Sequence, residues 1–248
     1  MISEFSLFLF TLLGGTAAGA YAFTWAFPTG ESKRRWLLPG IALVLLAIGG
    51  VALLLHLGHP ERMLFAFSNL SAGITREGIT TGLFGALVLV DLIFAIRSNK
   101  PVPKALGIVT ALAGVALLVA MGSAYTQFHG VTAWANWTSM ALFVIGGLSA
   151  GVCLISLCNA GIARNGSFGI CAVALNVLFA CTAIALGAHF ATIGYSLIPF
   201  ICSAALAIAA AISSWLAKGR DGFACIALSF ALALAAVIIA RYAFYLVV

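Results

Sequence analysis

Long apolar segments recur along the whole chain, separated by short polar connections. Each is about 20 residues long, the length that an α-helix needs to cross a bilayer core of roughly 30 Å. Their apolar positions are continuous rather than alternating, which indicates helices and not the strands of a membrane barrel. The pattern therefore predicts an all-α integral membrane protein with eight transmembrane helices, at residues 5–27, 37–57, 78–96, 104–125, 137–160, 168–190, 196–217 and 223–246.

The composition excludes a water-soluble protein. Charged residues make up 7% of the 248 positions and hydrophobic residues 64%, whereas a soluble domain has roughly a quarter charged residues. Eight spans leave no room for a soluble domain, so we expect one transmembrane domain over residues 1–248, surrounded by membrane lipid. No basic segment precedes the first apolar run, so we expect that run to be a retained helix rather than a cleaved signal peptide.

The basic residues predict the orientation of the helices. Lys and Arg are enriched in cytoplasmic connections, and most of the 12 fall after the first, third, fifth and seventh segments. We therefore expect those connections inside the cell and both termini outside. The net charge of +6 is then a topology signal rather than a nucleic-acid-binding surface. The residues concerned are Lys33, Arg34, Arg35, Arg97, Lys100, Lys104, Arg164, Lys218 and Arg220.

With this orientation, the other ionisable side chains gather at the outer ends of the helices. All four His, together with Glu77 and Arg241, are expected there. Ionisable groups at membrane depth are costly and are functional candidates by default, and His56 and Glu77 bracket one outer connection. Asp91 lies about 21 Å below Glu77 along the third helix, and we expect it to be a solvated helix end.

Simpler roles are expected for the remaining outer residues, as interfacial anchors, solvated histidines and an aromatic belt. The interfacial anchors are Arg62 and Arg76, the solvated histidines are His129 and His189, and the aromatic belt is Trp134 and Trp137. Four His at one depth exclude a two-haem electron wire, and one haem between His56 and His189 stays a minor alternative. The six Cys form no C-x-x-C pair and are expected to be packing residues. The prediction is a protein with no bound metal.

Two blocks of sequence carry a resemblance to a known family. His56-Leu-Gly-His-Pro-Glu-Arg62, followed by Asn69-Leu-Ser-Ala-Gly-Ile-Thr-Arg-Glu77, resembles the signature of the dimethyl-sulfoxide-reductase membrane-anchor subunits (DmsC-like). That signature is HLGxPxR, then an Asn and a Ser- or Arg-Glu sequence at the next helix. The block Ala240-Arg-Tyr-Ala-Phe-Tyr245 is similar to the last helix of the same family, and the stretch from Tyr125 to Trp137 matches more loosely. The sequence departs from the pattern at His59 and Gly78, where other residues are common.

The resemblance implies a haem-free anchor subunit that oxidises a quinol, menaquinol by default, in the cell membrane of a prokaryote. It implies two partners on the outer face: an iron–sulfur subunit with four [4Fe–4S] clusters and a molybdopterin catalytic subunit. The protein would then be the quinol-oxidising subunit of an oxidoreductase complex in anaerobic respiration, and not catalytic alone. In that family the His of the first motif and the Glu of the second are associated with quinol oxidation, and these correspond to His56 and Glu77.

The chemistry of these side chains is compatible with that role. Quinol oxidation releases two electrons and two protons, so a site needs acceptors for O–H groups and a slot for an apolar ring. His56 titrates near neutrality and suits a proton acceptor, and Glu77 could relay the proton to outer water. Tyr125 is expected to contact the ring. Arg241 is expected to hold Glu77, or another outer-face acceptor, as a charged partner.

Other interpretations stay open. An anchor of the NrfD/polysulfide-reductase type would share the role with a different helix arrangement. A secondary transporter would place charge or broken helices near mid-membrane, where Asn176 is the main polar residue of this sequence. A third possibility is a structural anchor whose His and Glu do no redox work. The terminal electron acceptor is chosen by the catalytic subunit, so this sequence does not name it.

Overall fold

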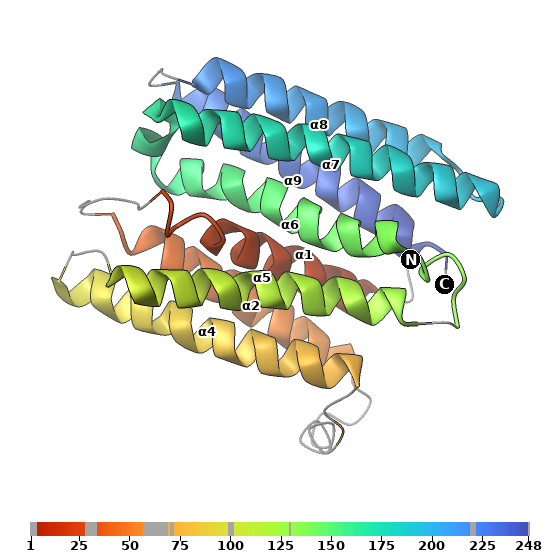
Figure 1. Cartoon of the computed structure of the whole chain (residues 1–248), viewed down its shortest axis with the longest axis horizontal. Helices are drawn as coiled ribbons and strands as arrows, with labels where there is room; N and C mark the ends of the chain where they lie inside the picture. The colour runs from red at the N-terminus through yellow and green to blue at the C-terminus, as the bar shows by residue number, and fades with distance from the viewer. Residues whose placement is uncertain are drawn as a thin grey trace.

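The computed structural model describes residues 4–27, 34–56, 69, 72–98, 102–128, 130–218 and 222–247, with the backbone alone for His56. Within these ranges the regular structure is helical, without strands. The helices lie side by side in one elongated bundle (Figure 1). Their bounds are α1 (Phe5–Tyr21), α2 (Leu37–His56), α4 (Gly73–Ser98), α5 (Lys104–Thr126), α6 (Trp137–Cys158), the short 3₁₀ helix η2 (Ala160–Arg164), α7 (Gly166–Thr192), α8 (Ile198–Ala217) and α9 (Phe223–Tyr245).

Each predicted apolar segment corresponds to one α-helix of the described part of the protein. Seven of these helices are long and apolar enough to cross a membrane, and α1, with 17 residues, is shorter but equally apolar. A multi-pass helical membrane protein is therefore confirmed as the fold class. Eight complete crossings stay a prediction, because α1 by itself falls short of the length that a full span needs.

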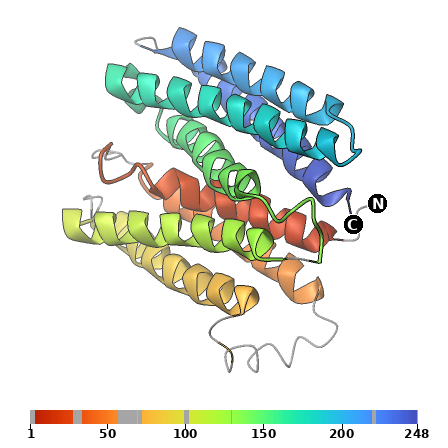
Figure 2. The ribbon, with the colours of Figure 1, turned by 45° about the vertical axis from the view of Figure 1, so that its right-hand side comes forward.

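Two groups of four helices make up the bundle (Figure 2). The first helix group contains α1, α2, α4 and α5, and the second helix group contains α6, α7, α8 and α9. The groups meet mainly where α6 packs against α1 and α5, with α9 also contacting α1. The helices α1 and α6 therefore lie at the centre of the molecule. Each group of four helices extends from one end of the bundle to the other.

Small residues allow α1 and α6 to touch through their backbones. Each helix carries two glycines four residues apart, Gly15 and Gly19 in α1 and Gly147 and Gly151 in α6. A Cβ atom added to Gly19 would collide with the Gly147 carbonyl group, and one added to Gly151 would collide with the backbone of Ala20 and Gly19. This spacing is typical of close helix–helix contacts in membranes, where packing rather than the hydrophobic effect drives association.

Large apolar side chains cover much of the outside of the bundle. Leu55 is 80% exposed, Ile198 69% and Ile96 68%. A surface of this kind is not stable in water, whereas lipid tails solvate it. The interior, in contrast, is rich in Ala, Phe and Leu, with buried glycines in several helices; small residues are expected where helices approach one another closely in a bilayer.

The polar residue at mid-membrane, Asn176, is hydrogen-bonded within the bundle. Its side-chain oxygen accepts a hydrogen bond from Ser149 at 2.9 Å, and its nitrogen donates to the Ala172 carbonyl at 2.8 Å. Asn176 is fully buried and connects α7 to α6. Its polar groups are therefore used in helix packing, and a transporter gains no support from it.

Both described termini lie at the same end of the bundle, with the start of α4 and the end of α5 (Figure 1). We call this the Glu77 end. The opposite end carries most of the basic residues of the described helix ends, and we call it the basic end. Which end faces the outside of the cell stays a prediction. The residues that define the basic end are Arg35, Arg97, Lys104, Arg164 and Lys218.

Candidate functional site

A cavity of about 520 Å³ opens at the Glu77 end of the first helix group. Residues of α1, α2, α4 and α5 surround it, together with Trp134 from the connection to α6. Its size and its mixture of apolar walls and a few polar groups are typical of small-molecule sites. The polar lining residues are Glu4, Glu77 and Tyr125, and the larger apolar ones are Leu7, Leu53, Phe128 and Trp134.

Glu77 lies inside α4 rather than in front of it. We expected the helix to start after Glu77, but it begins at Gly73, and the Arg76 amide already donates to the Ala72 carbonyl. The sequence interpretation was wrong because hydropathy detects only the apolar part of a helix, whereas backbone hydrogen bonds continue through a polar first turn. Glu77 is therefore held by a regular turn, one turn inside the helix.

The Glu77 carboxyl group is almost completely buried. Its residue is 5% exposed, and its Oε1 atom has no hydrogen-bond partner within the described part of the protein. Nearly all buried polar atoms of proteins find a partner, since an unpaired one costs free energy. An unpaired carboxyl oxygen in the wall of a cavity can accept a hydrogen bond from a ligand.

Tyr125 stands beside Glu77 in the same cavity, held by aromatic packing. Its ring stacks on Phe143 with centroids 4.6 Å apart and packs edge-on against Trp134. Its hydroxyl accepts a hydrogen bond of 2.6 Å from the Tyr245 hydroxyl. Because its oxygen is the acceptor of that bond, the Tyr125 hydroxyl keeps its own proton for a further acceptor. The structure therefore brings together two of the predicted site residues, Glu77 and Tyr125.

Arg241 is fully buried in α9 and does not pair with a carboxylate of the described residues. Its guanidinium donates to the backbone carbonyls of Thr11 and Phe143 and lies 4.9 Å from the Phe143 ring centroid. The expected pairing with Glu77 is not found, and no other charged partner of Arg241 lies among the described residues. Gly15 makes this arrangement possible, because a Cβ there would lie 3.1 Å from a guanidinium nitrogen. Close helix packing brings neutral carbonyl groups within reach, which sequence spacing does not reveal.

A series of polar contacts connects Arg241 to the cavity. Arg241 donates to the Thr11 carbonyl, the Thr11 hydroxyl lies 3.3 Å from the Tyr245 hydroxyl, and Tyr245 donates to Tyr125. Sequence reasoning did not select Thr11 or Tyr245. A signal was present for Tyr245, because it ends the block in which Arg241 is followed by aromatic residues. Thr11 had no such signal.

Trp134 belongs to the site and not to an aromatic belt. It is 5% exposed, its indole nitrogen donates to the Phe244 carbonyl at 2.9 Å, and its ring stacks on Phe244. The belt interpretation was wrong for Trp134 because its ring packs against Tyr125 and Phe244 and lines the cavity. Trp137 is 73% exposed, as an interfacial residue is.

The predicted site residue His56 ends α2, and its side chain lies outside the described residues. Leu53, less than one turn before it, lines the cavity, so the end of α2 is directed to the site. His59, Arg62 and His129 also lie outside the described residues. The pairing of His56 with Glu77 therefore stays a prediction.

His189, at the end of α7, is half-buried, and its Nε2 atom is shielded from solvent. The expectation of a solvated side chain was wrong at that nitrogen. His189 does not line the cavity beside Glu77. Among the described residues, no group of three or more His, Cys, Asp or Glu side chains is placed to hold a metal ion.

Asp91, expected at a solvated helix end, is buried at the basic end of α4. Its two carboxylate oxygens accept hydrogen bonds from Arg35 at 2.6 Å and from Tyr21 at 2.8 Å. The expectation was wrong because depth along one helix does not show which helices pack beside it. The end of α1 and the residues before α2 cover this position.

The fold and the site define a multi-pass helical membrane protein with a buried acid and a tyrosine around a cavity at one end of its helices. The protein belongs to the family of DMSO reductase anchor subunits (DmsC), whose sequence model matches residues 1–247. It is 29% identical to the C subunit of the anaerobic dimethyl sulfoxide reductase of Escherichia coli K12, over 98% of this sequence and 94% of that relative. It is 30% identical to the C subunit of the anaerobic dimethyl sulfoxide reductase of Haemophilus influenzae, over 61% of this sequence and 58% of that relative. No solved structure matches this protein. The resemblance in the sequence is confirmed.

Proposed function

We propose that this protein binds a quinol in the cavity beside Glu77, oxidises it and passes the electrons to an iron–sulfur subunit of a DMSO-reductase-like complex. The observation that carries the proposal is the Glu77 side chain, which lines this cavity and whose buried Oε1 atom lacks a partner among the described residues. Menaquinol is the quinol that membership of the anchor family favours. The electrons would continue to a molybdopterin subunit, where the terminal acceptor is reduced.

The cavity offers what an aromatic diol with an apolar tail needs. Leu7, Leu53 and Phe128 provide apolar walls for the ring, and Trp134 adds an aromatic surface. The volume of about 520 Å³ suits a quinol ring with the first part of its tail. The rest of the tail would lie against the lipid-facing surface of the bundle.

Oxidation of the quinol breaks both of its O–H bonds and gives a quinone, two protons and two electrons. Glu77 would accept a hydrogen bond from one hydroxyl, take up its proton and release it to water at the Glu77 end. His56, at the adjacent end of α2, would accept the proton of the second quinol hydroxyl. The electrons would leave singly to the nearest cluster of an iron–sulfur subunit bound at this end.

The series of contacts from Arg241 would position Tyr125 for this reaction. Tyr245 fixes the Tyr125 hydroxyl oxygen as an acceptor, so the proton of Tyr125 is directed to another group. Within the cavity, Glu77 and a quinol oxygen are the acceptors that we assign to this proton. Tyr125 would thus hold the ring while Glu77 takes the proton, and Arg241 would hold α1, α6 and α9 around them.

Both protons and electrons would leave toward the same side in this scheme. We place the Glu77 end outside the cell, with the four-cluster iron–sulfur subunit and the molybdopterin subunit bound to it, in the cell membrane of a prokaryote. Quinol oxidation by this subunit alone would then generate no membrane potential.

Replacement of Glu77 by Gln in the assembled complex tests the proposal. Gln keeps the size and hydrogen bonding of the side chain but removes the proton acceptor, so quinol-dependent turnover should be lost. Turnover with an artificial donor that reduces the iron–sulfur clusters directly should stay at the wild-type rate. His56→Phe, which keeps an aromatic ring without a titratable nitrogen, should behave in the same way.

Glu31→Gln is the matched control, because Glu31 lies in the sequence between α1 and α2 and the substitution is identical. We expect it to retain quinol-dependent turnover. Full quinol-dependent activity of Glu77→Gln would contradict the proposal and favour a purely structural anchor. Loss of activity with the artificial donor as well would show that Glu77 acts in assembly instead.

A further inference from the structure

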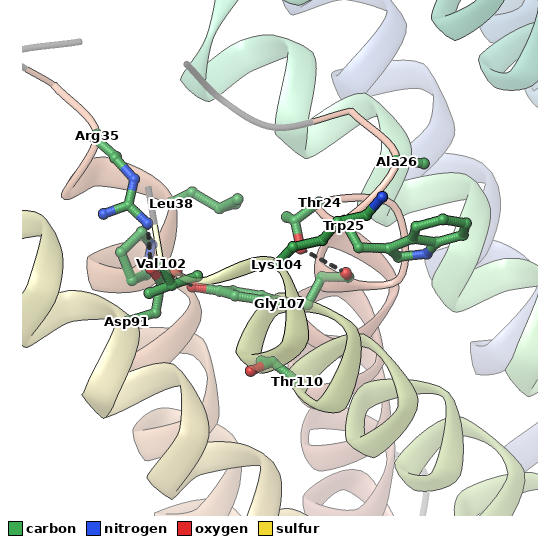
Figure 3. A pocket seen from close by; sticks show the side chains of 12 residues that line it. Thr24, Trp25, Ala26, Arg35, Leu38, Asp91, Val102, Lys104, Gly107 and Thr110 are labelled. Carbon is green, nitrogen blue, oxygen red and sulfur yellow. Dashed lines mark hydrogen bonds and ion pairs between the residues drawn. The ribbon is translucent and has the colours of Figure 1, made fainter. Parts of the chain in front are cut away.

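The first helix group encloses a second cavity, at the basic end (Figure 3). Its volume is about 530 Å³. The end of α1, the start of α2, Asp91 of α4 and the start of α5 line it. Phe84 is fully buried and lies midway between Glu77 and Asp91 along α4, so packed side chains separate this cavity from the one at the Glu77 end. Quinol chemistry at Glu77 therefore leaves this second cavity without a role.

The wall of the second cavity carries a buried arginine with unused hydrogen-bonding capacity. Arg35 is 7% exposed, and its Nη2 atom lies 2.6 Å from Asp91 Oδ1. Its Nη1 atom has no partner in the part of the protein that the structure describes. Asp91 is already engaged through both oxygens, because Tyr21 donates to Oδ2. An additional anion would satisfy the remaining guanidinium donors.

The charge of the described lining is positive. Lys104, the first residue of α5, lines the cavity together with Arg35, and Asp91 is the one acidic residue among the described lining side chains. Arg35 and Asp91 lie on one side of the cavity, and Lys104 lies with Trp25 on the other (Figure 3). A ligand between them would meet two cationic side chains and one carboxylate that is already paired.

Two helices begin at this cavity, which adds to its preference for an anion. Leu38 belongs to the first turn of α2, and Lys104 and Gly107 to the first turn of α5. Neither first turn contains an acidic residue. The start of α2 offers few free N–H groups, because Pro39 has none and the Leu37 amide donates to Arg34, whereas α5 has no side-chain cap. The free N–H groups and the dipole of a helix N-terminus favour anions, phosphate above all.

The surroundings of the cavity are those of a membrane boundary. Trp25 is 49% exposed at its rim, and Trp side chains are enriched at the level of lipid headgroups. Beyond the first turn of α5, Ile108 and Val109 expose apolar side chains, which can accompany an acyl chain. A ligand that brings both a phosphate and apolar chains therefore matches the site better than a free anion.

We propose that this cavity binds the phosphate of an anionic phospholipid, with its headgroup between Arg35 and Lys104 and its acyl tails along α5. Basic pockets between transmembrane helices are recognised sites for anionic headgroups. The bound lipid would connect the ends of α1, α2 and α5 to Asp91 of α4. It would stabilise the helix group from the end opposite to the quinol cavity.

The test measures lipid retention by the purified full-length protein. The protein is placed in nanodiscs made of equal parts phosphatidylglycerol and phosphatidylcholine. It is then released from the nanodiscs in the mass spectrometer, and native mass spectrometry identifies and counts the lipids that stay bound. We expect the wild type to retain phosphatidylglycerol in preference. Lys104→Glu removes one cation and leaves the Arg35–Asp91 pair intact, so it should reduce that retention several-fold.

Two further variants separate this site from general effects of charge and folding. Gly107→Leu fills the cavity without changing the charge, and the nearest atom to a Cβ at this position is 4.0 Å away. It should reduce retention as Lys104→Glu does. Lys218→Glu makes the same charge change at the same end of the bundle, outside the cavity, where Lys218 lies over the Trp215 ring. It should retain phosphatidylglycerol as the wild type does.

Equal retention of phosphatidylglycerol by the wild type, Lys104→Glu and Gly107→Leu would overturn the proposal. Equal retention of phosphatidylcholine by the wild type would do the same. A third measurement distinguishes lipid from free phosphate: phosphatidylglycerol added to the detergent micelles should raise the melting temperature more than inorganic phosphate at the same concentration. An equal rise would assign the site to a soluble anion instead. None of these measurements depends on quinol turnover.

Discussion

Two acidic side chains of one helix, Glu77 and Asp91, are buried at opposite ends of α4 with different surroundings. Asp91 accepts hydrogen bonds on both oxygens, from Arg35 and Tyr21. Glu77 has an oxygen without a partner among the described residues, and it lines a cavity. A carboxylate that is already paired contributes to structure, whereas an unpaired one retains the capacity to bind. The Asp91 carboxylate therefore holds helices together at one end of α4, whereas the Glu77 carboxyl group keeps the capacity to bind a ligand at the other end.

Tyr245→Phe tests the positioning of Tyr125 at the residue scale. The substitution removes the 2.6 Å hydrogen bond to the Tyr125 hydroxyl and leaves the ring packing in place. The loss of one hydrogen bond, about 1 kcal/mol, should lower kcat/KM for quinol by about fivefold. Turnover with the artificial donor should not change, and kinetics with both donors measure the difference.

Tyr242→Phe is the control for this substitution, because Tyr242 is on the same helix but 40% exposed. It should leave both activities as in the wild type. If Tyr245→Phe has wild-type kcat/KM for quinol, the contact with Tyr125 does not take part in the reaction.

At the scale of elements, the contact between α1 and α6 joins the two helix groups. At their glycines the backbones of the two helices are in direct contact, with no side chains between them. Arg241 of α9 also stabilises this junction, because it donates a hydrogen bond to one backbone carbonyl of each helix. Because Thr11 and Phe143 provide those carbonyls, and Phe143 also stacks on Tyr125, the junction supports the wall of the cavity beside Glu77.

Gly19→Leu should disrupt this junction. Even a Cβ at Gly19 collides with the Gly147 carbonyl, so the two helices must separate. Overpacking typically costs about 1–3 kcal/mol, and backbone cannot move aside as a side chain can, so we expect a cost at the upper end. A lower melting temperature and a lower yield of folded protein in detergent would measure it.

Gly50→Ala is the matched control on α2. A Cβ at Gly50 meets nothing within 4 Å, and Ala favours a helix over Gly by about 1 kcal/mol. This variant should be as stable as the wild type or slightly more stable. An unchanged melting temperature for Gly19→Leu would show that α1 and α6 do not touch through their backbones.

At the scale of the whole molecule, both described termini and the start of α4, which carries Glu77, lie at one end of the bundle (Figure 1). Most of the described basic residues belong to helix ends at the other end. The positive-inside rule then predicts that the basic end faces the cytoplasm. The cavity beside Glu77 would face the outside, together with any partner that takes its electrons.

A reporter that is active only outside the cytoplasm tests this orientation. Fused after Val248, it should be active, because the end of α9 belongs to the Glu77 end. Fused after Lys218, at the basic end, it should be inactive. The opposite pair of results would reverse the molecule in the membrane and move the expected partner subunits to the other side.

The sequence by itself determined the positions of the helices and the family. Membrane-spanning helices are specified locally, because every such segment must be apolar over its own length. The motif around His56 and Glu77 and the block that ends at Tyr245 led to the anchor family before any fold was known. Glu77 and Tyr125, both selected from the sequence, line one cavity in the structure, and their role in quinol binding stays a prediction.

Only the tertiary structure decided which side chains meet across helices. Arg35 and Asp91 are far apart in the sequence, as are Arg241 and the Thr11 carbonyl. Hydropathy shows how deep a residue lies along its helix, but not how that helix is rotated about its axis or which helices pack beside it. Those are set by close packing at small residues such as Gly15 and Gly19, which leave room for a guanidinium or a backbone contact. The two cavities arise in the same way: residues of α1, α2, α4 and α5 line each of them, and the shape of such a space depends on all four helices together.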